Sequence, residues 1–161
     1  MKQLKRSAET VQQALAGAGM DLEVVELPAS TRSAKEAAMA VGCEVDQIAK
    51  SIVFRTIQSN RAVMVVARGS RRVDEGRVAT AVGESIEKAT PDFVRGATGY
   101  AIGGVPPCGH LNPVLVLLDE GLQDLETLWA AAGTPNAVFS LTPEQLVELT
   151  GGRLLKVVVP S

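Results

Sequence analysis

Residues 50–68 read "KSIVFRTIQSNRAVMVVAR", two apolar, β-branched runs separated by the turn-forming residues QSN. Runs of this kind on either side of a short polar break predict a β-hairpin, here with strands at 50–57 and 61–68. The helix and strand signals before and after this hairpin then determine what kind of sheet it belongs to.

Three elements are expected before the hairpin. Apolar residues at helical spacing predict an amphipathic helix over residues 4–18, and the sequence LEVVEL predicts a short strand at 22–27. A second helix is expected at 34–41, because Ser33 and Glu36 have the spacing of a capping box at its start. The chain therefore enters the hairpin through alternating helix and strand.

Seven elements are expected after the hairpin. In chain order they are a short helix between Asp74 and Gly83, a short helix at 91–95, a strand at 114–118, a helix at 122–133, a strand at 136–141, a helix at 142–150 and a strand at 153–159. The helix at 122–133 is expected because Leu122, Leu125, Leu128 and Trp129 share one helical face. A capping box of Thr142 and Gln145 starts the later helix.

The order of these elements predicts an α/β fold. A hairpin mixed with single helices between strands favours one mixed, mainly antiparallel sheet, flanked by helices and curled toward a barrel, over a doubly wound parallel sheet. The 161 residues suit one compact domain over 1–161, because two cores of ordinary size need more chain.

Composition excludes several functions. The net charge of −2 has the wrong sign for a protein that wraps phosphate backbone, so no DNA partner is expected and any nucleic-acid contact is local. The aromatic content of 3% argues against a base-stacking platform. The longest apolar runs are far too short to span a bilayer and no secretory leader is recognised, so a cytoplasmic protein without a membrane partner is expected.

One loop concentrates unusual residues. Residues 99–110, "GYAIGGVPPCGH", hold the only histidine, the only tyrosine and one of the two cysteines. Glycines allow close approach of a ligand to the backbone, and prolines hold the backbone amides in place for a developing oxyanion. The same composition also suits a rigid turn before the strand at 114–118. Both interpretations stay open on these residues alone.

The thiols and the histidine give weaker hypotheses. Cys43, Cys108 and His110 supply at most three ligands, whereas structural zinc takes four with paired spacings, so no metal is expected. A nucleophilic pair of Cys108 and His110 would place the base two residues from the thiol, which rarely orients correctly without a third group. Cys108 is more simply interpreted as small filler in a turn.

Two basic features are also ambiguous. Three arginines lie at the end of the predicted hairpin and just after it: Arg68, Arg71 and Arg72. They suit either a solvated turn or a binding site for a few phosphates. Lys50 begins an otherwise apolar strand, where a lysine usually covers apolar neighbours with its stem.

Several segments together resemble a known family. They are "SAKEAAMAVGCEVDQIAKSIVF" at 33–54, "VARGSRRVD" at 66–74, "ATGYAIGGVPPCGH" at 97–110, "VLLDEGL" at 116–122 and "AAAGTPNAVFSLTPEQLVELTGG" at 130–152. In this order and spacing the chain is similar to the YbaK/ProX family, the free-standing relatives of the editing domain inserted in bacterial prolyl-tRNA synthetase. The similarity runs over nearly the whole chain.

This resemblance implies an enzyme that hydrolyses, in trans, the ester bond of an amino acid mischarged on tRNA. It implies no cofactor, no metal and no covalent cysteine. Lys50 takes the position of the family's catalytic lysine, facing a loop from Gly103 to Pro107. The substrate-binding residues are then Thr31, Ser33, Ser51, Gly103, Gly104, Val105, Pro106, Pro107 and His110. The tRNA-phosphate candidates are Arg68, Arg71 and Arg72.

The implied partners are the acceptor end of aminoacyl-tRNA, most simply tRNA for proline, and prolyl-tRNA synthetase as a second candidate. A small substrate such as Ala, 2-aminobutyrate, Ser, Thr or Cys is expected, because a synthetase discriminates weakly against amino acids smaller than its own. Pro106 and His110 differ from the cysteine-clearing branch, and Ser51 differs from the asparagine of the alanine-clearing branch. The alternatives are a non-catalytic module that binds tRNA or a synthetase, and a thiol hydrolase.

Overall fold

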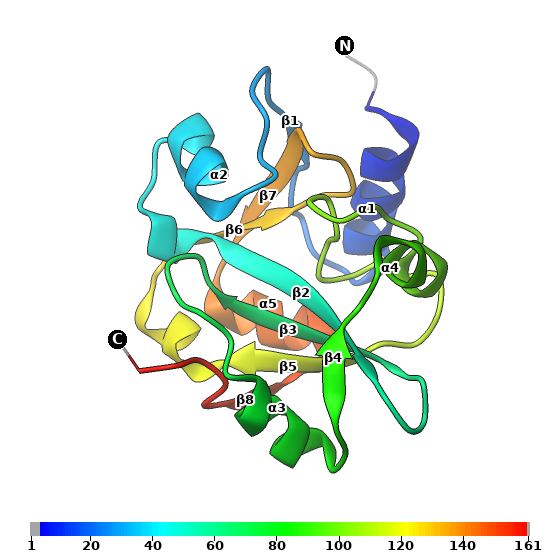
Figure 1. The fold of residues 1–161 in the computed structure, drawn as a ribbon. Coiled ribbons are helices and arrows are strands. Elements are labelled where there is room, and N and C mark those ends of the chain that lie inside the picture. Colours follow the sequence, from blue (N-terminus) through cyan, green and yellow to red (C-terminus); the bar gives the residue numbers. More distant parts are fainter. Residues whose placement is uncertain (1–3, 161) are drawn as a thin grey trace.

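The expected hairpin lies at the centre of the fold (Figure 1). In the computed structural model, which describes residues 4–160, it consists of β2 (Ala49–Thr56) and β3 (Ala62–Arg68). The two strands pair in antiparallel register, with Lys50 opposite Ala67 and Phe54 opposite Val63. The expected domain of 1–161 also includes residues 1–3 and 161, which lie outside the described residues.

The hairpin belongs to a five-stranded sheet with the order β4-β2-β3-β5-β8. The added strands are β4 (Ile86–Lys88), antiparallel to β2, and β5 (Leu115–Asp119) and β8 (Arg153–Leu155), which run parallel to β3 and β5 respectively. A second, antiparallel sheet has the order β1-β7-β6 and is formed by β1 (Val25–Glu26), β7 (Ala137–Leu141) and β6 (Leu128–Ala131). An isolated bridge between Ile48 and Trp129 joins the two sheets.

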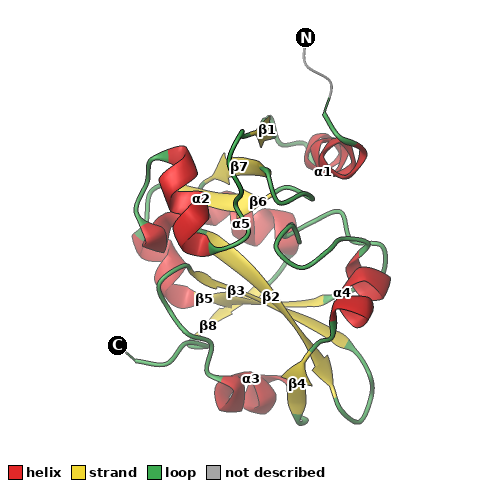
Figure 2. Ribbon diagram, turned by 45° about the horizontal axis from the view of Figure 1, so that its top comes forward, coloured by secondary structure: helices red, strands yellow, loops and turns green. Residues whose placement is uncertain are grey.

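The expected fold class is confirmed. The strands are mixed and mainly antiparallel, and helices flank them (Figure 2). The sheets adjoin at the Ile48 bridge but, within residues 4–160, they do not close into a barrel. No helix in the described part of the chain is long and apolar enough to cross a bilayer.

The helices begin and end where local chemistry places them. They are α1 (Arg6–Gly17), α2 (Ala34–Val41), α3 (Glu75–Val82), α4 (Pro91–Thr98) and α5 (Pro143–Thr150). Side chains of Ser33, Asp74, Thr90 and Thr142 accept hydrogen bonds from the first-turn amides of the last four helices. Each of these four helices ends at a glycine in the left-handed conformation.

The two faces of the five-stranded sheet pack against different elements. Val53 of β2 packs into the large core that contains Leu15 of α1 and Leu146 of α5. Phe54, the next residue, packs on the opposite face with Val78 of α3. Successive side chains of a strand point to opposite faces, so this alternation also separates Lys50 from Ser51.

The predicted helix at 122–133 is wrong. A short 3-10 helix at Glu120–Asp124 is followed by strand β6, which pairs with β7. The burial of β6 alternates, with Leu128 and Ala130 buried and Trp129 and Ala131 half-buried, as a strand requires. Pairing with β7 therefore outweighs the helical propensity of the leucine- and alanine-rich sequence.

Other differences concern element ends. The strand expected at 22–27 shortens to β1, and the strand expected at 153–159 shortens to β8, after which Val158 forms an isolated bridge with Val73. The helix expected at 91–95 continues to Thr98, and β4 was not predicted. None of these differences alters the order of the main elements.

Candidate active site

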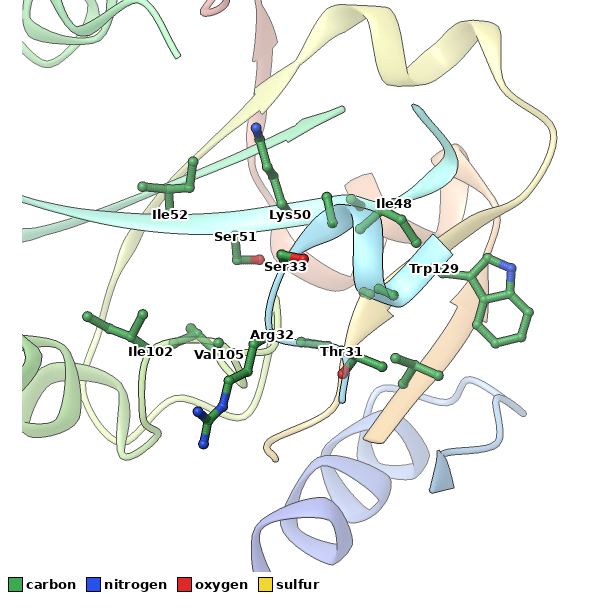
Figure 3. Close-up of a pocket in the computed structure, with 17 residues that line it drawn as sticks. Thr31, Arg32, Ser33, Ile48, Lys50, Ser51, Ile52, Ile102, Val105 and Trp129 are labelled. Carbon is green, nitrogen blue, oxygen red and sulfur yellow. The ribbon is translucent and has the colours of Figure 1, made fainter. Parts of the chain in front are cut away.

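A cavity of about 270 Å³ lies where the two sheets meet α2 and the loop before β5 (Figure 3). Its polar side chains come from Thr31, Arg32, Ser33, Lys50 and Ser51. Its apolar walls include Ile48, Ile52, Ile102, Val105 and Trp129. The cavity therefore has a few polar groups on a mainly apolar surface, which is the usual character of a small-ligand site.

The segment before α2 is fixed by hydrogen bonds. The buried Thr31 hydroxyl donates to the Pro135 carbonyl at 2.8 Å, which ties this segment to the turn between β6 and β7. Ser33 Oγ accepts from the Glu36 amide at 3.1 Å and caps α2. The positive end of the α2 dipole therefore lies at the cavity, beside the exposed Arg32.

The glycine loop closes the cavity opposite α2. Gly103 lies on its wall with φ of +93°, and a Cβ built there would be 3.2 Å from Cγ of Arg32. Gly104 is buried in the loop, where its amide donates to Ala101 and its carbonyl accepts from Gly133. Within residues 4–160 the Gly103 amide donates no hydrogen bond to the protein.

Lys50 lies at the edge of this cavity and points away from the glycine loop. Its Nζ donates to the Gly69 carbonyl at 3.2 Å. In Figure 3 its ammonium lies on the opposite side of β2 from Ser51 and Val105. The expectation that the loop faces the lysine ammonium is therefore not met in this conformation. Burial lowers the pKa of Lys50, and the charge of Lys88 lowers this pKa further.

The structure brings part of the predicted site together. Lining the cavity are Thr31, Ser33, Lys50, Ser51, Gly103 and Val105. Gly104, Pro106 and Pro107 are buried in the loop behind it. His110 Nε2 lies 2.7 Å from the Pro106 carbonyl oxygen, so the imidazole supports the loop, and burial lowers its pKa.

Sequence reasoning missed several lining residues. Arg32 stands between two residues that were predicted, and that position is the signal that could have found it. Trp129 was assigned to a helix face, so its place beside the cavity followed only from strand β6. Ile48 and Ile102 carried no signal, because apolar residues of this kind are found in any core.

The three predicted phosphate contacts are not equivalent. Arg68 Nε donates to the buried Asp119 carboxylate at 2.8 Å, and the Arg68 amide donates to it at 3.1 Å. The hydrogen bond from the guanidinium to Asp119 raises the pKa of Arg68 and occupies its side chain. Arg71 and Arg72 form no ion pair within residues 4–160.

The geometry does not suit a thiol hydrolase. Burial raises the pKa of Cys108 to about 11, so the nucleophilic thiolate is scarce at neutral pH. No hydrogen bond joins Cys108 to His110 in the described part of the chain. Across residues 4–160, His, Cys, Asp and Glu side chains form no group of three that could hold a metal ion.

Comparison with known proteins shows the family. Residues 28–149 match the aminoacyl-tRNA editing domain, so the chain belongs to that family. A proline–tRNA ligase of Limosilactobacillus fermentum is 30% identical over 128 residues, which are 77% of this chain and 20% of the ligase. The chain is therefore related to the editing domain of the synthetase for proline.

Two further relatives are similar over most of their length. A crystal structure described as a candidate trans-editing enzyme for prolyl tRNA synthetase is 48% identical with a TM-score of 0.92, and the match covers 98% of this chain and 100% of that chain. The uncharacterised protein YwhH of Bacillus subtilis is 31% identical over 128 residues, or 80% of this chain and 81% of that protein.

Proposed function

We propose that this protein is a trans-editing deacylase that hydrolyses the ester between a small amino acid and a mischarged tRNA, most simply tRNA for proline. The carrying observation is the cavity, which is lined by Ser51, by the capped start of α2 and by Gly103, whose amide donates no hydrogen bond within residues 4–160. The family match to an aminoacyl-tRNA editing domain supports the same assignment.

The proposed reaction depends more on the position of the ester and the attacking water than on a protein side chain that acts as an acid or a base. Water adds to the carbonyl carbon, the ester C–O bond breaks, and the ribose oxygen leaves with the proton that water loses. Negative charge develops on the carbonyl oxygen, and a fixed amide such as that of Gly103 stabilises this charge. A hydroxyl of the terminal ribose can assist the water in place of a protein base.

Lys50 contributes charge in this proposal. Its ammonium engages the terminal phosphate or the ribose edge and holds the ester over the cavity. A cation that is half-buried and repelled by Lys88 is stabilised by an anionic substrate, because the substrate replaces lost solvation. The other polar groups, Thr31 and Ser33, position the segment that precedes α2.

The test is a panel of tRNAs for proline carrying Ala, 2-aminobutyrate, Ser, Thr, Cys or proline. We expect hydrolysis of at least one small amino acid and no loss of the prolyl ester. A Lys50→Ala variant should lose about 100-fold in turnover, the effect of removing one charge-stabilising group. Lys35→Ala removes an exposed lysine from the first turn of α2, outside the residues that line the cavity, and is the matched control.

Two results would contradict the proposal. Wild-type protein that binds mischarged tRNA without hydrolysing any of the esters would be a non-catalytic binding module. Near-normal turnover by a folded Lys50→Ala variant would remove the lysine from the mechanism. Circular dichroism and a urea titration establish that each variant is folded.

A further inference from the structure

A second concave surface lies on the other face of β2. It has a volume of about 320 Å³, and we call it the basic cleft. Its charged side chains are Lys50, Arg71, Arg72, Glu75 and Lys88. Because Lys50 and Ile52 share the face that packs toward α3, this cleft is separated by the strand from Ser51 and Gly103.

The basic cleft has excess positive charge. Four of its charged side chains are cations and one is an acid, Glu75. Within residues 4–160 the ion pairs involve Arg55, Arg68 and Arg77, so none of the four cations is neutralised by a salt bridge. Lys50 and Lys88 both line the cleft; burial lowers the pKa of Lys50, and the charge of Lys88 lowers this pKa further. An anion in the cleft would relieve this repulsion.

The loop that carries the arginines is held in place. A Cβ on Gly69 would lie 2.2 Å from the Val45 carbonyl oxygen, so the loop packs there at backbone contact. The Arg71 amide donates to Arg68 and the Arg72 carbonyl accepts from Val159. The two arginines are therefore presented by a fixed backbone, which limits the entropy lost when they bind a ligand.

The free edge of β2 joins the basic cleft to the candidate active site. In the described part of the chain, Trp129 of β6 bridges Ile48, the residue before β2. At the other end the Ala89 amide donates to the Val53 carbonyl, and the ladder with β4 begins at Phe54. Between these points Lys50 and Ile52 line both the cleft and the 270 Å³ cavity. A chain that crosses this short edge can occupy both sites at once.

We infer that the basic cleft binds the phosphodiester backbone of the nucleotides that precede the aminoacylated one, while the terminal nucleoside and its ester lie across β2. The inference rests on the proposed function. It adds Lys88 to the residues that bind phosphate. It also takes Arg68 out of the phosphate candidates, because the Arg68 guanidinium is held by Asp119. Contacts to phosphates fix the register of a nucleic acid without reading its sequence, so this cleft positions the ester.

The test is direct binding of an uncharged RNA hairpin that ends in a single-stranded 3′ overhang, followed by fluorescence anisotropy. Arg71→Gln, Arg72→Gln and Lys88→Gln are combined in one variant. We expect at least 10-fold weaker binding and a salt dependence reduced by about 0.7 per lost contact, the value for single strands. The matched control combines Lys5→Gln, Arg61→Gln and Arg95→Gln, which removes the same number of charges at exposed positions outside the cleft.

Wild-type affinity and salt dependence in the triple variant would overturn the inference, as would an equal loss in the control. Aminoacyl-adenosine, which has no phosphates, separates the two proposals. The triple variant should hydrolyse it at the wild-type rate while losing activity on aminoacylated RNA. If wild-type protein hydrolyses neither ester but the triple variant still loses RNA affinity, the deacylase assignment fails and the cleft stands.

Discussion

Gly103 and Gly104 are adjacent glycines that the fold requires for different reasons. Gly103 has φ of +93° and faces Arg32 at the cavity, whereas a Cβ on Gly104 would lie 3.1 Å from backbone atoms of Thr134. The first glycine therefore sets the shape of the cavity wall, and the second lets the loop pack against the β6–β7 turn.

Replacing Gly103 by alanine should lower the free energy of unfolding by about 1–2 kcal/mol, because an L-residue is strained at positive φ. The rate of deacylation should fall by more than the loss of folded protein explains, because the new methyl group displaces Arg32 at the cavity wall. Urea denaturation and turnover measure the two effects. Gly96→Ala is the control: in α4 it meets no atom within 4 Å and should stabilise the protein by about 0.5–1 kcal/mol. Full turnover by Gly103→Ala would contradict the assigned role.

The buried Cys108 thiol predicts a pH dependence of stability. Its pKa rises from 9.0 to about 11 on folding, so the unfolded chain ionises first as the pH increases. The contribution of Cys108 to the free energy of unfolding is therefore fully present below pH 9. It is lost as the pH rises from 9 to about 11, by about 3 kcal/mol in total. Urea titrations from pH 8 to pH 11 should show this decrease in wild type relative to Cys108→Ala. Parallel curves for the two proteins would rule it out.

Deacylation by Cys108→Ala should match wild type at neutral pH, because the thiol is protonated and takes no part in the chemistry. Complete inactivation of a folded Cys108→Ala variant would restore the thiol hydrolase hypothesis.

At the scale of elements, one buried carboxylate joins β3 to β5. Asp119 accepts hydrogen bonds from the amide and guanidinium of Arg68 and from the amide of Gly121. Asp119→Ala leaves the guanidinium uncompensated and should lower the free energy of unfolding by about 3 kcal/mol. Glu87→Ala breaks the more exposed pair with Arg55 and should cost less than about 1 kcal/mol. Equal losses in urea denaturation would contradict this ranking.

Elements with local signals were predictable, and those that depend on distant pairing were not. Ser33, Asp74 and Thr142 marked three helix starts, because capping depends on residues within one turn. Strand β6 has the composition of a helix and becomes a strand only through its pairing with β7. Strand β4 is three residues long, too short for any period to be recognised.

At the scale of the whole molecule, the cavity lies where the two sheets adjoin, at the bridge between Ile48 and Trp129. Local sequence patterns could not indicate this junction, since Thr31, Lys50 and Gly103 come from distant segments. The family resemblance grouped these residues, and five of the nine predicted substrate-binding residues line the cavity together with Lys50, while Gly104, Pro106 and Pro107 are buried in the loop behind it. The sequence did not show which face of β2 the Lys50 side chain takes, because this depends on the register in which β2 pairs with β3.

Between Ile48 and Val53, the edge of β2 that faces away from β3 has no ladder partner among residues 4–160, and this has a consequence for solubility. An exposed strand edge is a template on which a second copy of the chain can add its own strand, and natural proteins often oppose this with a lysine. Lys50 stands on this edge, so the charge proposed to hold the substrate also discourages self-association. Selection for a monodisperse protein and selection for editing would then act on the same side chain.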